Sequence, residues 1–258
     1  MGEVFWGRGV RDWVDIQEPL QRPLYEAILD VLALQPGQAL LDAGCGSGVV
    51  CALAAGRGLD VTGLDASTMF IDVARQRCPT GRFMVGDLRE PLPFADESFA
   101  GVMFSNSLQF VPNAADAVRE AKRVARPGSR IAIAVFDAPQ KCQGQKPIGA
   151  IISLLPAAPA TSPFTLSRDA TLEGLITDAG LEFEGIRRVE TPWHYPDFET
   201  VLRAFASAGP AQQAVEIVGE QKLRAILETA TAPFLQTDGS YLLENVFMVA
   251  SGCKAAAG

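Results

Sequence analysis

The chain has 258 residues, of which 48% are hydrophobic and 20% charged, and its formal net charge is −8. This length suits one domain with insertions, or one domain with a small appendage, and the apolar content suffices for a buried core. Polyanion binding draws on clustered Lys and Arg. This acidic chain has no basic run, so we expect neither DNA nor RNA as a partner.

The apolar runs of the sequence are too short for a transmembrane helix, and residues 1–8 lack the basic end and apolar centre of a signal peptide. We therefore expect a cytoplasmic protein without a membrane partner. Five cysteines, without a Cys-x-x-Cys pair, fit a reducing compartment better than a disulfide framework or a zinc site. Because His194 is the one histidine, a His-rich metal cluster is excluded, and we predict no metal ion.

Residues 10–34 are predicted to be helical, with Pro19 and Pro23 separating a short aromatic piece from a longer amphipathic one. Turn chemistry at Gln35-Pro36-Gly37 ends this region. We treat 1–37 as an N-terminal helical cap, which either packs over a ligand or simply covers a sheet.

From residue 38 to 136, short apolar strands alternate with helices. Strands are predicted over 38–42, 60–65, 82–86, 100–105 and 129–136, and helices over 48–57, 68–77 and 113–125. Apolar strands separated by helices indicate a doubly wound α/β fold with a mostly parallel sheet. In such sheets ligands bind at the carboxyl ends of the strands. Four polar residues end these apolar strands: Asp42, Asp65, Asp87 and Ser105.

A glycine loop follows the first of these strands, with Gly44, Gly46 and Gly48 at every second position. Glycine adopts positive φ and lets a ligand approach the backbone, and the helix that follows aims free N–H groups at the same place. The short glycine spacing differs from the usual dinucleotide fingerprint. A nucleotide-type site is therefore predicted at this loop.

Beyond residue 136 the pattern loosens. Residues 138–168 hold five prolines and an apolar patch at 148–155. The remaining predicted elements are a helix at 170–179, strands at 182–192 and 241–250, and two helices between these strands, at 197–208 and 210–230.

The sequence Leu-Asp-Ala-Gly-Cys-Gly-Ser-Gly at 41–48 resembles the first motif of class I S-adenosylmethionine-dependent methyltransferases, of the type 11/25-like kind that acts on small molecules. Later motifs agree with that family in order and spacing. They are Val-Thr-Gly-Leu-Asp at 61–65, Phe-Met-Val-Gly-Asp-Leu at 83–88, Leu-Pro-Phe at 92–94 with the strand that ends in Ser105, and Arg-Pro-Gly-Ser-Arg-Ile at 126–131. The likeness covers residues 38 to 136.

This resemblance implies a Rossmann-like sheet of seven strands, mostly parallel, whose last strand is antiparallel. It also implies a division into a cofactor-binding core at 38–137, an insertion at 138–168, and a C-terminal part of the core at 169–258 with inserted helices at 196–239. If the family's strand order holds, both insertions leave the sheet at the cofactor edge. We then expect them to form, with the N-terminal helices, a lid over the active site.

The resemblance also implies S-adenosylmethionine as the cofactor, and it assigns roles residue by residue. The loop of Gly44, Cys45, Gly46 and Gly48 would approach the methionine and ribose parts, and Asp42 would orient the amino group. The other implied contacts are Asp65, followed by Ala66, to the ribose hydroxyls; Gly86, Asp87 and Leu88 to the adenine; and the Ser105 backbone near the sulfonium. Asn106, Leu108 and Gln109 are placed to face the pocket.

Blander interpretations of three of these residues stay open. Cys45 is a small residue that fills a tight turn, Asp65 is a candidate helix N-cap, and Asp87 is a candidate turn aspartate. The sequence also departs from the family, because Phe99-Ala100 replaces the usual Phe-Asp before the fourth strand. That aspartate is usually structural, so the departure leaves cofactor binding intact.

The expected acceptor is a small, apolar or aromatic molecule, methylated on O, N or C. The family's Asn/Asp-Pro-Pro-aromatic box for amino groups is missing, since Ser-Asn-Ser-Leu stands at 105–108. His194 is the candidate general base, although a surface or packed histidine is commoner. Weaker candidates are Tyr195, Asp137 and Glu18. Four aromatic residues either line an apolar pocket or belong to the core: Phe5, Trp6, Trp13 and Trp193.

Three other functions remain open at this point. An NAD-dependent dehydrogenase shares the strand, glycine loop and distal acid, although the short spacing and the Asp87 motif count against it. A binding protein would keep the cofactor pocket without catalysis, and another enzyme class would use the cofactor for non-methyl chemistry. The oligomeric state is open, a homodimer being one option.

Overall fold

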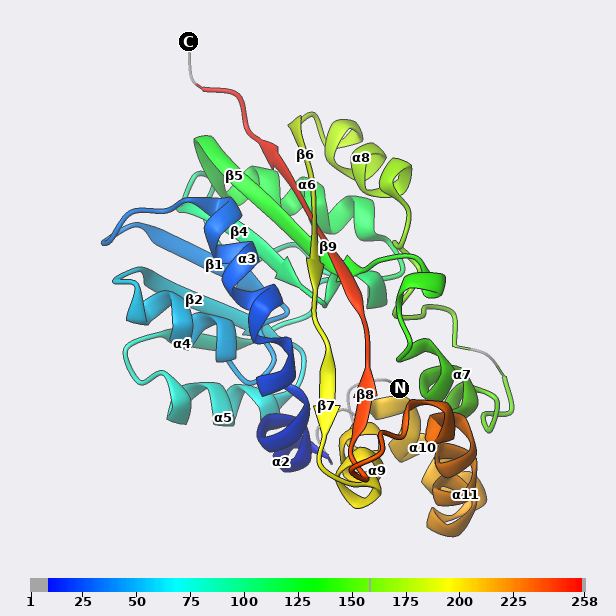
Figure 1. Ribbon diagram of the computed structural model, residues 1–258. Helices are drawn as coiled ribbons and strands as arrows, with labels where there is room; N and C mark the ends of the chain where they lie inside the picture. The colour runs from blue at the N-terminus through cyan, green and yellow to red at the C-terminus, as the bar shows by residue number, and fades with distance from the viewer. Residues whose placement is uncertain (1–8, 158, 257–258) are drawn as a thin grey trace. The chain divides into compact units, whose positions relative to one another are not determined.

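The computed structural model describes residues 9–157 and 159–256, so the predictions for Phe5 and Trp6 lie outside the described residues (Figure 1). The chain divides into two compact units. We call the first the helical unit; it comprises Met1–Arg22, Pro139–Ala160 and Glu190–Val246. The second, the sheet unit, comprises Pro23–Ala138, Thr161–Val189 and Phe247–Gly258. Each unit is described by itself below.

The described part of the sheet unit holds a seven-stranded sheet in the order β3-β2-β1-β4-β5-β9-β6. The strands are β1 (Ala39–Ala43), β2 (Asp60–Asp65), β3 (Arg82–Val85), β4 (Phe99–Ser105), β5 (Ala125–Phe136), β6 (Glu182–Glu190) and β9 (Val246–Cys253). The first five pair in parallel, and β9 pairs antiparallel with β5, Arg130 opposite Cys253 and Phe136 opposite Phe247. The predicted doubly wound α/β fold, with an antiparallel last strand, is confirmed.

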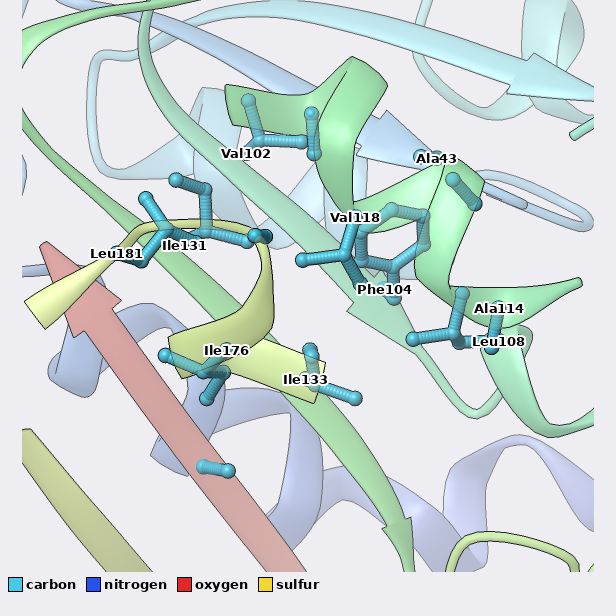
Figure 2. Close-up of a cluster of buried hydrophobic side chains, with 14 of the residues drawn as sticks. Ala43, Val102, Phe104, Leu108, Ala114, Val118, Ile131, Ile133, Ile176 and Leu181 are labelled. Carbon is cyan, nitrogen blue, oxygen red and sulfur yellow. The ribbon is translucent and has the colours of Figure 1, made fainter. Parts of the chain in front are cut away.

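Helices cover the sheet as the apolar strands require. The helices of this unit are α3 (Arg22–Leu32), α4 (Val49–Gly56), α5 (Thr68–Arg77), α6 (Ala114–Val124) and α8 (Asp169–Asp178), with a 3-10 turn η3 at Leu108–Phe110. In Figure 2, Val118 of α6 and Ile176 of α8 lie over Phe104 of β4 and Ile131 and Ile133 of β5, all of them fully buried. Figure 1 shows α4 and α5 on the opposite face, beside β2 and β3.

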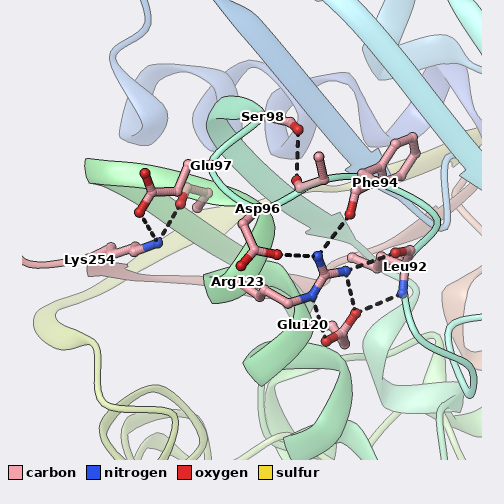
Figure 3. A network of polar contacts seen from close by, with 10 residues as sticks. Leu92, Phe94, Asp96, Glu97, Ser98, Glu120, Arg123 and Lys254 are labelled. Carbon is pink, nitrogen blue, oxygen red and sulfur yellow. Dashed lines mark hydrogen bonds and ion pairs between the residues drawn. The ribbon is translucent and has the colours of Figure 1, made fainter.

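The connection from β3 to β4, residues 86–98, contains no helix and is held by side chains instead (Figure 3). Arg123 of α6 donates hydrogen bonds to the carbonyl oxygens of Leu92 at 2.9 Å and Phe94 at 2.8 Å, and it pairs with Asp96 and Glu120. Glu120 in turn accepts from the backbone N–H of Leu92 at 2.8 Å. One guanidinium therefore fastens the connection to a helix of the core.

The helical unit is built mainly from residues outside the family-like region. Its helices are α2 (Val10–Asp12), the π-helix η1 (Trp13–Gln17), the 3-10 helices η2 (Pro19–Gln21), η4 (Pro139–Lys141) and η5 (Ala232–Phe234), α7 (Gln145–Ile152), α9 (Phe198–Ala206), α10 (Gly209–Val218) and α11 (Glu220–Thr231). Strands β7 (Trp193–Tyr195) and β8 (Tyr241–Leu243) form a separate antiparallel pair.

Two predicted elements of this region are each divided in the structure. The strand expected at 241–250 becomes β8 and β9, because Asn245 leaves the ladder and bonds through its side chain. Its Oδ1 accepts from Gly144 N at 2.9 Å, and its Nδ2 donates to Leu243 O at 3.0 Å. The helix expected at 210–230 breaks at Gly219, whose φ of +81° no helix accommodates.

Candidate functional site

Asp42, the residue before the end of β1, is a buried carboxylate with one oxygen to spare. Its side chain is 1% exposed, and Oδ2 accepts a weak hydrogen bond from the Cys51 thiol at 3.6 Å. Oδ1 has no hydrogen-bond partner among the described residues. Burial raises the pKa of Asp42 to about 7; the Cys51 bond opposes this rise and the charge of Asp65 adds to it. A positively charged group beside Oδ1 would favour the carboxylate.

The glycine loop directly follows β1, and its glycines differ in what surrounds them. A Cβ on Gly44 would lie 2.4 Å from the Ser107 Cβ, and one on Gly48 would lie 2.8 Å from the Ala74 Cβ, so packing alone demands glycine there. At Gly46 a Cβ would meet nothing within 4 Å. The backbone at Gly46 therefore borders open space, as close approach of a ligand requires.

Asp65 ends β2 and ties this loop to the next helix. Its Oδ2 accepts from Gly46 N and its Oδ1 from Ser67 N, both at 2.9 Å. The N-cap of α5 is Ser67, whose Oγ accepts from Phe70 N at 3.4 Å, so Asp65 is not the cap itself. Ala66, half-buried, lies between the two.

The end of β3 gives a mixed result for its three predicted residues. Asp87 binds Arg89, accepting from its backbone N–H at 2.9 Å and from Nε at 2.8 and 2.9 Å. These bonds lower the pKa of Asp87 and match the turn-aspartate interpretation. Gly86 packs against Leu64, because a Cβ on Gly86 would lie 2.7 Å from the Leu64 Cδ1. Leu88 is half-buried against the core, and its Cδ1 would lie 3.4 Å from a Cβ on Gly44, beside the glycine loop.

The end of β4 approaches the same loop. Ser107 donates through Oγ to the Ala43 carbonyl at 2.7 Å. The Ser105 hydroxyl is buried and has no partner among the described residues, and the same holds for Oε1 of Gln109, a side chain with 0% exposure. Sequence reasoning placed Gln109 at the pocket only in general terms, because its burial depends on tertiary packing.

Strand register brings these residues to one edge of the sheet unit. Asp42 lies opposite Gly63 of β2 and Met103 of β4, and Asp65 lies opposite Val85 of β3. The carboxyl ends of β1 to β4 are therefore adjacent, as the sequence predicts. Together they offer a buried carboxylate, an open glycine backbone and two unpartnered polar atoms.

The predicted base, His194, belongs to the helical unit. It is exposed on β7, between the buried residues Trp193 and Tyr195, and its base role stays a prediction. The Tyr195 hydroxyl donates to Gln17 Oε1 at 2.9 Å, and burial raises its pKa above the usual range, so it is a poor base. Asp137, in the sheet unit, is paired with Arg188 at 2.9 Å.

The remaining candidates of the helical unit have no assigned chemistry. Glu18 is buried, Trp193 packs edge-on to Phe205 with ring centroids 6.1 Å apart, and Trp13 is half-buried in the π-helix. Within residues 9–157 and 159–256, no helix has the length and apolar character needed to cross a bilayer. The same ranges contain no cluster of three or more His, Cys, Asp or Glu side chains placed for a metal ion.

Comparison with known proteins agrees with this geometry. A model of the methyltransferase domain family matches residues 41–133. The malonyl-[acyl-carrier protein] O-methyltransferase of Serratia marcescens is 30% identical over 204 residues, which are 76% of this chain and 72% of that protein. The demethylmenaquinone methyltransferase of Beutenbergia cavernae is 40% identical over 113 residues, 44% of this chain; the chain spans about half of that relative, 47%.

Among solved structures, the YcgJ protein from Bacillus subtilis has the same fold, with a TM-score of 0.62 and 19% identity over 90% of this chain and 98% of that one. The sequence relationship to the Serratia enzyme extends over most of both chains, and it rules against the dehydrogenase alternative. The chain belongs to the class I S-adenosylmethionine-dependent methyltransferases.

Proposed function

We propose that S-adenosylmethionine binds at the carboxyl edge of β1 to β4 and that its methyl group passes to a small, apolar or aromatic acceptor. The observation that carries the cofactor assignment is Asp42 Oδ1, a buried carboxylate oxygen without a partner among the described residues. The α-ammonium group of the cofactor would donate to it and offset the burial of its charge. Open space at the Gly46 backbone supports the same placement.

The ribose and adenine contacts are part of this proposal. The two oxygens of Asp65 accept the backbone N–H groups of Gly46 and Ser67, and in this proposal the carboxylate also receives the ribose hydroxyls. Asp87 would have to share its carboxylate between Arg89 and the adenine amine. We therefore assign Asp65 the stronger part in cofactor binding.

The bound cofactor supplies a methyl group activated by a positively charged sulfur. The chain itself binds, orients and excludes water, which is why a single catalytic side chain need not stand out. His194 would take the proton of a phenol or enol in this scheme.

The acceptor class rests on charge and on the end of β4. The net charge of −8 disfavours polyanions, and the amino-directed box is missing at 105–108. The two relatives are named for malonyl-[acyl-carrier protein] and for demethylmenaquinone, which are chemically different acceptors. We propose that segments outside the matched range 41–133 select the acceptor. The expected lid stays a prediction.

Calorimetry with S-adenosylmethionine, S-adenosylhomocysteine and NAD tests the cofactor site. We expect the two sulfur compounds to bind with micromolar affinity, about 8 kcal/mol, and NAD not to bind. Asp65→Ala should abolish binding. The matched control is Asp60→Asn, at the exposed amino end of β2, and should leave binding unchanged. Methylated product, sought by mass spectrometry with metabolite mixtures, separates an enzyme from a protein that only binds the cofactor.

A further inference from the structure

Three buried polar side-chain atoms in the described sheet unit have no hydrogen-bond partner: Asp42 Oδ1, Ser105 Oγ and Gln109 Oε1. They lie at, or directly after, the carboxyl ends of β1 and β4, which are neighbours in the sheet. Buried polar atoms in native proteins nearly always have a partner, so each exception needs a reason. The cofactor's ammonium group accounts for Asp42 alone.

The orientation of Gln109 follows from its place in the short helix η3. The preceding residue, Leu108, is fully buried in the hydrophobic cluster of β4, β5 and α6 (Figure 2). Successive residues of a 3-10 helix point about 120° apart, so Gln109 faces away from the direction in which Leu108 packs. Its Nε2 donates to Asn106 Oδ1, which fixes the amide and leaves Oε1 as a free acceptor.

The segment that carries Gln109 is tied to the glycine loop. Asn106 N donates to Ala134 O at 2.9 Å, continuing the pairing of β4 with β5, and then turns the chain with a φ of +57°. Ser107 next binds the Ala43 carbonyl and packs at the position of the missing Gly44 side chain. Gln109 therefore belongs to the proposed cofactor edge.

A purely structural role does not explain this glutamine. An unpartnered buried carbonyl lowers stability, and the bond from Nε2 to Asn106 makes no use of it. Residues that reduce the stability of the free protein are typical of binding sites. The spare oxygen thus indicates a ligand group that donates a hydrogen bond.

We propose that Gln109 Oε1 accepts a hydrogen bond from the methyl acceptor, so the acceptor carries an O–H or N–H group. The Ser105 hydroxyl serves the same group from the end of β4. This inference rests on the proposed function and narrows it, since a C-acceptor without a donor would leave Oε1 unpartnered. Gln109 orients the group and takes no proton.

Matched probes test the inference on protein saturated with S-adenosylhomocysteine. We would titrate 1-naphthol against 1-methoxynaphthalene, and 1-naphthylamine against 1-methylnaphthalene, and follow side-chain amide signals of ¹⁵N-glutamine-labelled protein by NMR. The donor-bearing member of each pair should bind about tenfold tighter or more. It should also shift the Gln109 amide signal, identified by its absence in Gln109→Met.

Gln109→Met should abolish the preference while still binding S-adenosylhomocysteine, which shows that the variant is folded. Gln212→Met, which changes a half-buried glutamine bonded to Ala206 O in the helical unit, should keep the preference. Equal binding within both pairs, a preference that survives in Gln109→Met, or no binding of any donor-bearing probe would each overturn the inference. Failure of the parent protein to bind S-adenosylhomocysteine would instead refute the proposed function.

Discussion

The buried carboxyl group of Asp42 makes the stability of the free protein depend on pH. Its pKa rises from 3.8 to about 7 on folding, chiefly through burial, and each pKa unit corresponds to about 1.4 kcal/mol. The fully buried side chain is not screened by solvent, so the shift is worth about 4 kcal/mol. The sign follows from protonation. The folded state holds the proton that the unfolded chain releases, so this stability is fully present below pH 3.8 and is lost as pH rises through about 7.

We therefore expect Asp42→Asn to be more stable than the parent protein at pH 8, by up to about 4 kcal/mol, because asparagine carries no charge to bury. At pH 5 the parent's Asp42 is protonated, and the difference should shrink to below about 2 kcal/mol. Urea unfolding curves between pH 5 and 8 measure this directly. Asp60→Asn, at an exposed position, is the matched control and should show no such trend.

Cofactor binding should show the opposite trend, because an ammonium group stabilises the carboxylate. The affinity of the parent for S-adenosylhomocysteine should rise with pH up to about 7, and Asp42→Asn should lose both the affinity and its pH dependence. If Asp42→Asn differs from the parent by the same amount at pH 5 and pH 8, burial does not perturb this carboxyl group. If it binds S-adenosylhomocysteine as tightly as the parent at pH 8, Asp42 does not contact the ligand.

Three further substitutions test other parts of the molecule. Arg123→Met should lower the free energy of unfolding by about 2 to 3 kcal/mol, because two loop carbonyls and Glu120 lose their hydrogen-bond donor. Arg119→Met, in an exposed pair, should change it by less than about 0.5 kcal/mol. Equal losses in the two variants would contradict the role given to Arg123. Gly46→Ala should weaken S-adenosylhomocysteine binding by more than about tenfold while costing about 1 kcal/mol of stability, and calorimetry that finds unchanged affinity would exclude ligand approach there. His194→Gln should slow methyl transfer by about 100-fold or more if His194 is the base, and an unchanged single-turnover rate would remove it from the mechanism.

The sequence predicted the sheet well because its strands are fully apolar and end in residues that local rules recognise. The predicted strands 60–65 and 100–105 match β2 and β4 to within one residue. Errors arose where one side chain redirects the backbone over a distance in sequence. Asn245 bonds to Gly144, 101 residues away, and this contact, invisible in a local pattern, divides the last predicted strand.

The site shows the same contrast between local and long-range information. The glycine loop and Asp65 were predicted from motif and spacing, and the structure places them at the ends of the adjacent strands β1 and β2. Arg89 follows Asp87 by two residues, a spacing that allows the turn interpretation of Asp87. The hydrogen bonds between the two side chains, however, depend on geometry that the sequence does not give. Burial of Gln109 Oε1 without a partner depends on packing around the whole edge, so no sequence pattern signals it.

The cysteines at the glycine loop can report how often this loop opens. Cys45 lies within the loop and Cys51 within α4, both buried, and burial together with the charge of Asp42 raises the pKa of both thiols. The thiolate is the nucleophile that attacks an alkylating reagent, so both cysteines should react slowly while the loop keeps its native contacts. The alkylation rate of Cys45 then measures how often this loop opens. A ligand bound to the loop backbone would lower that rate.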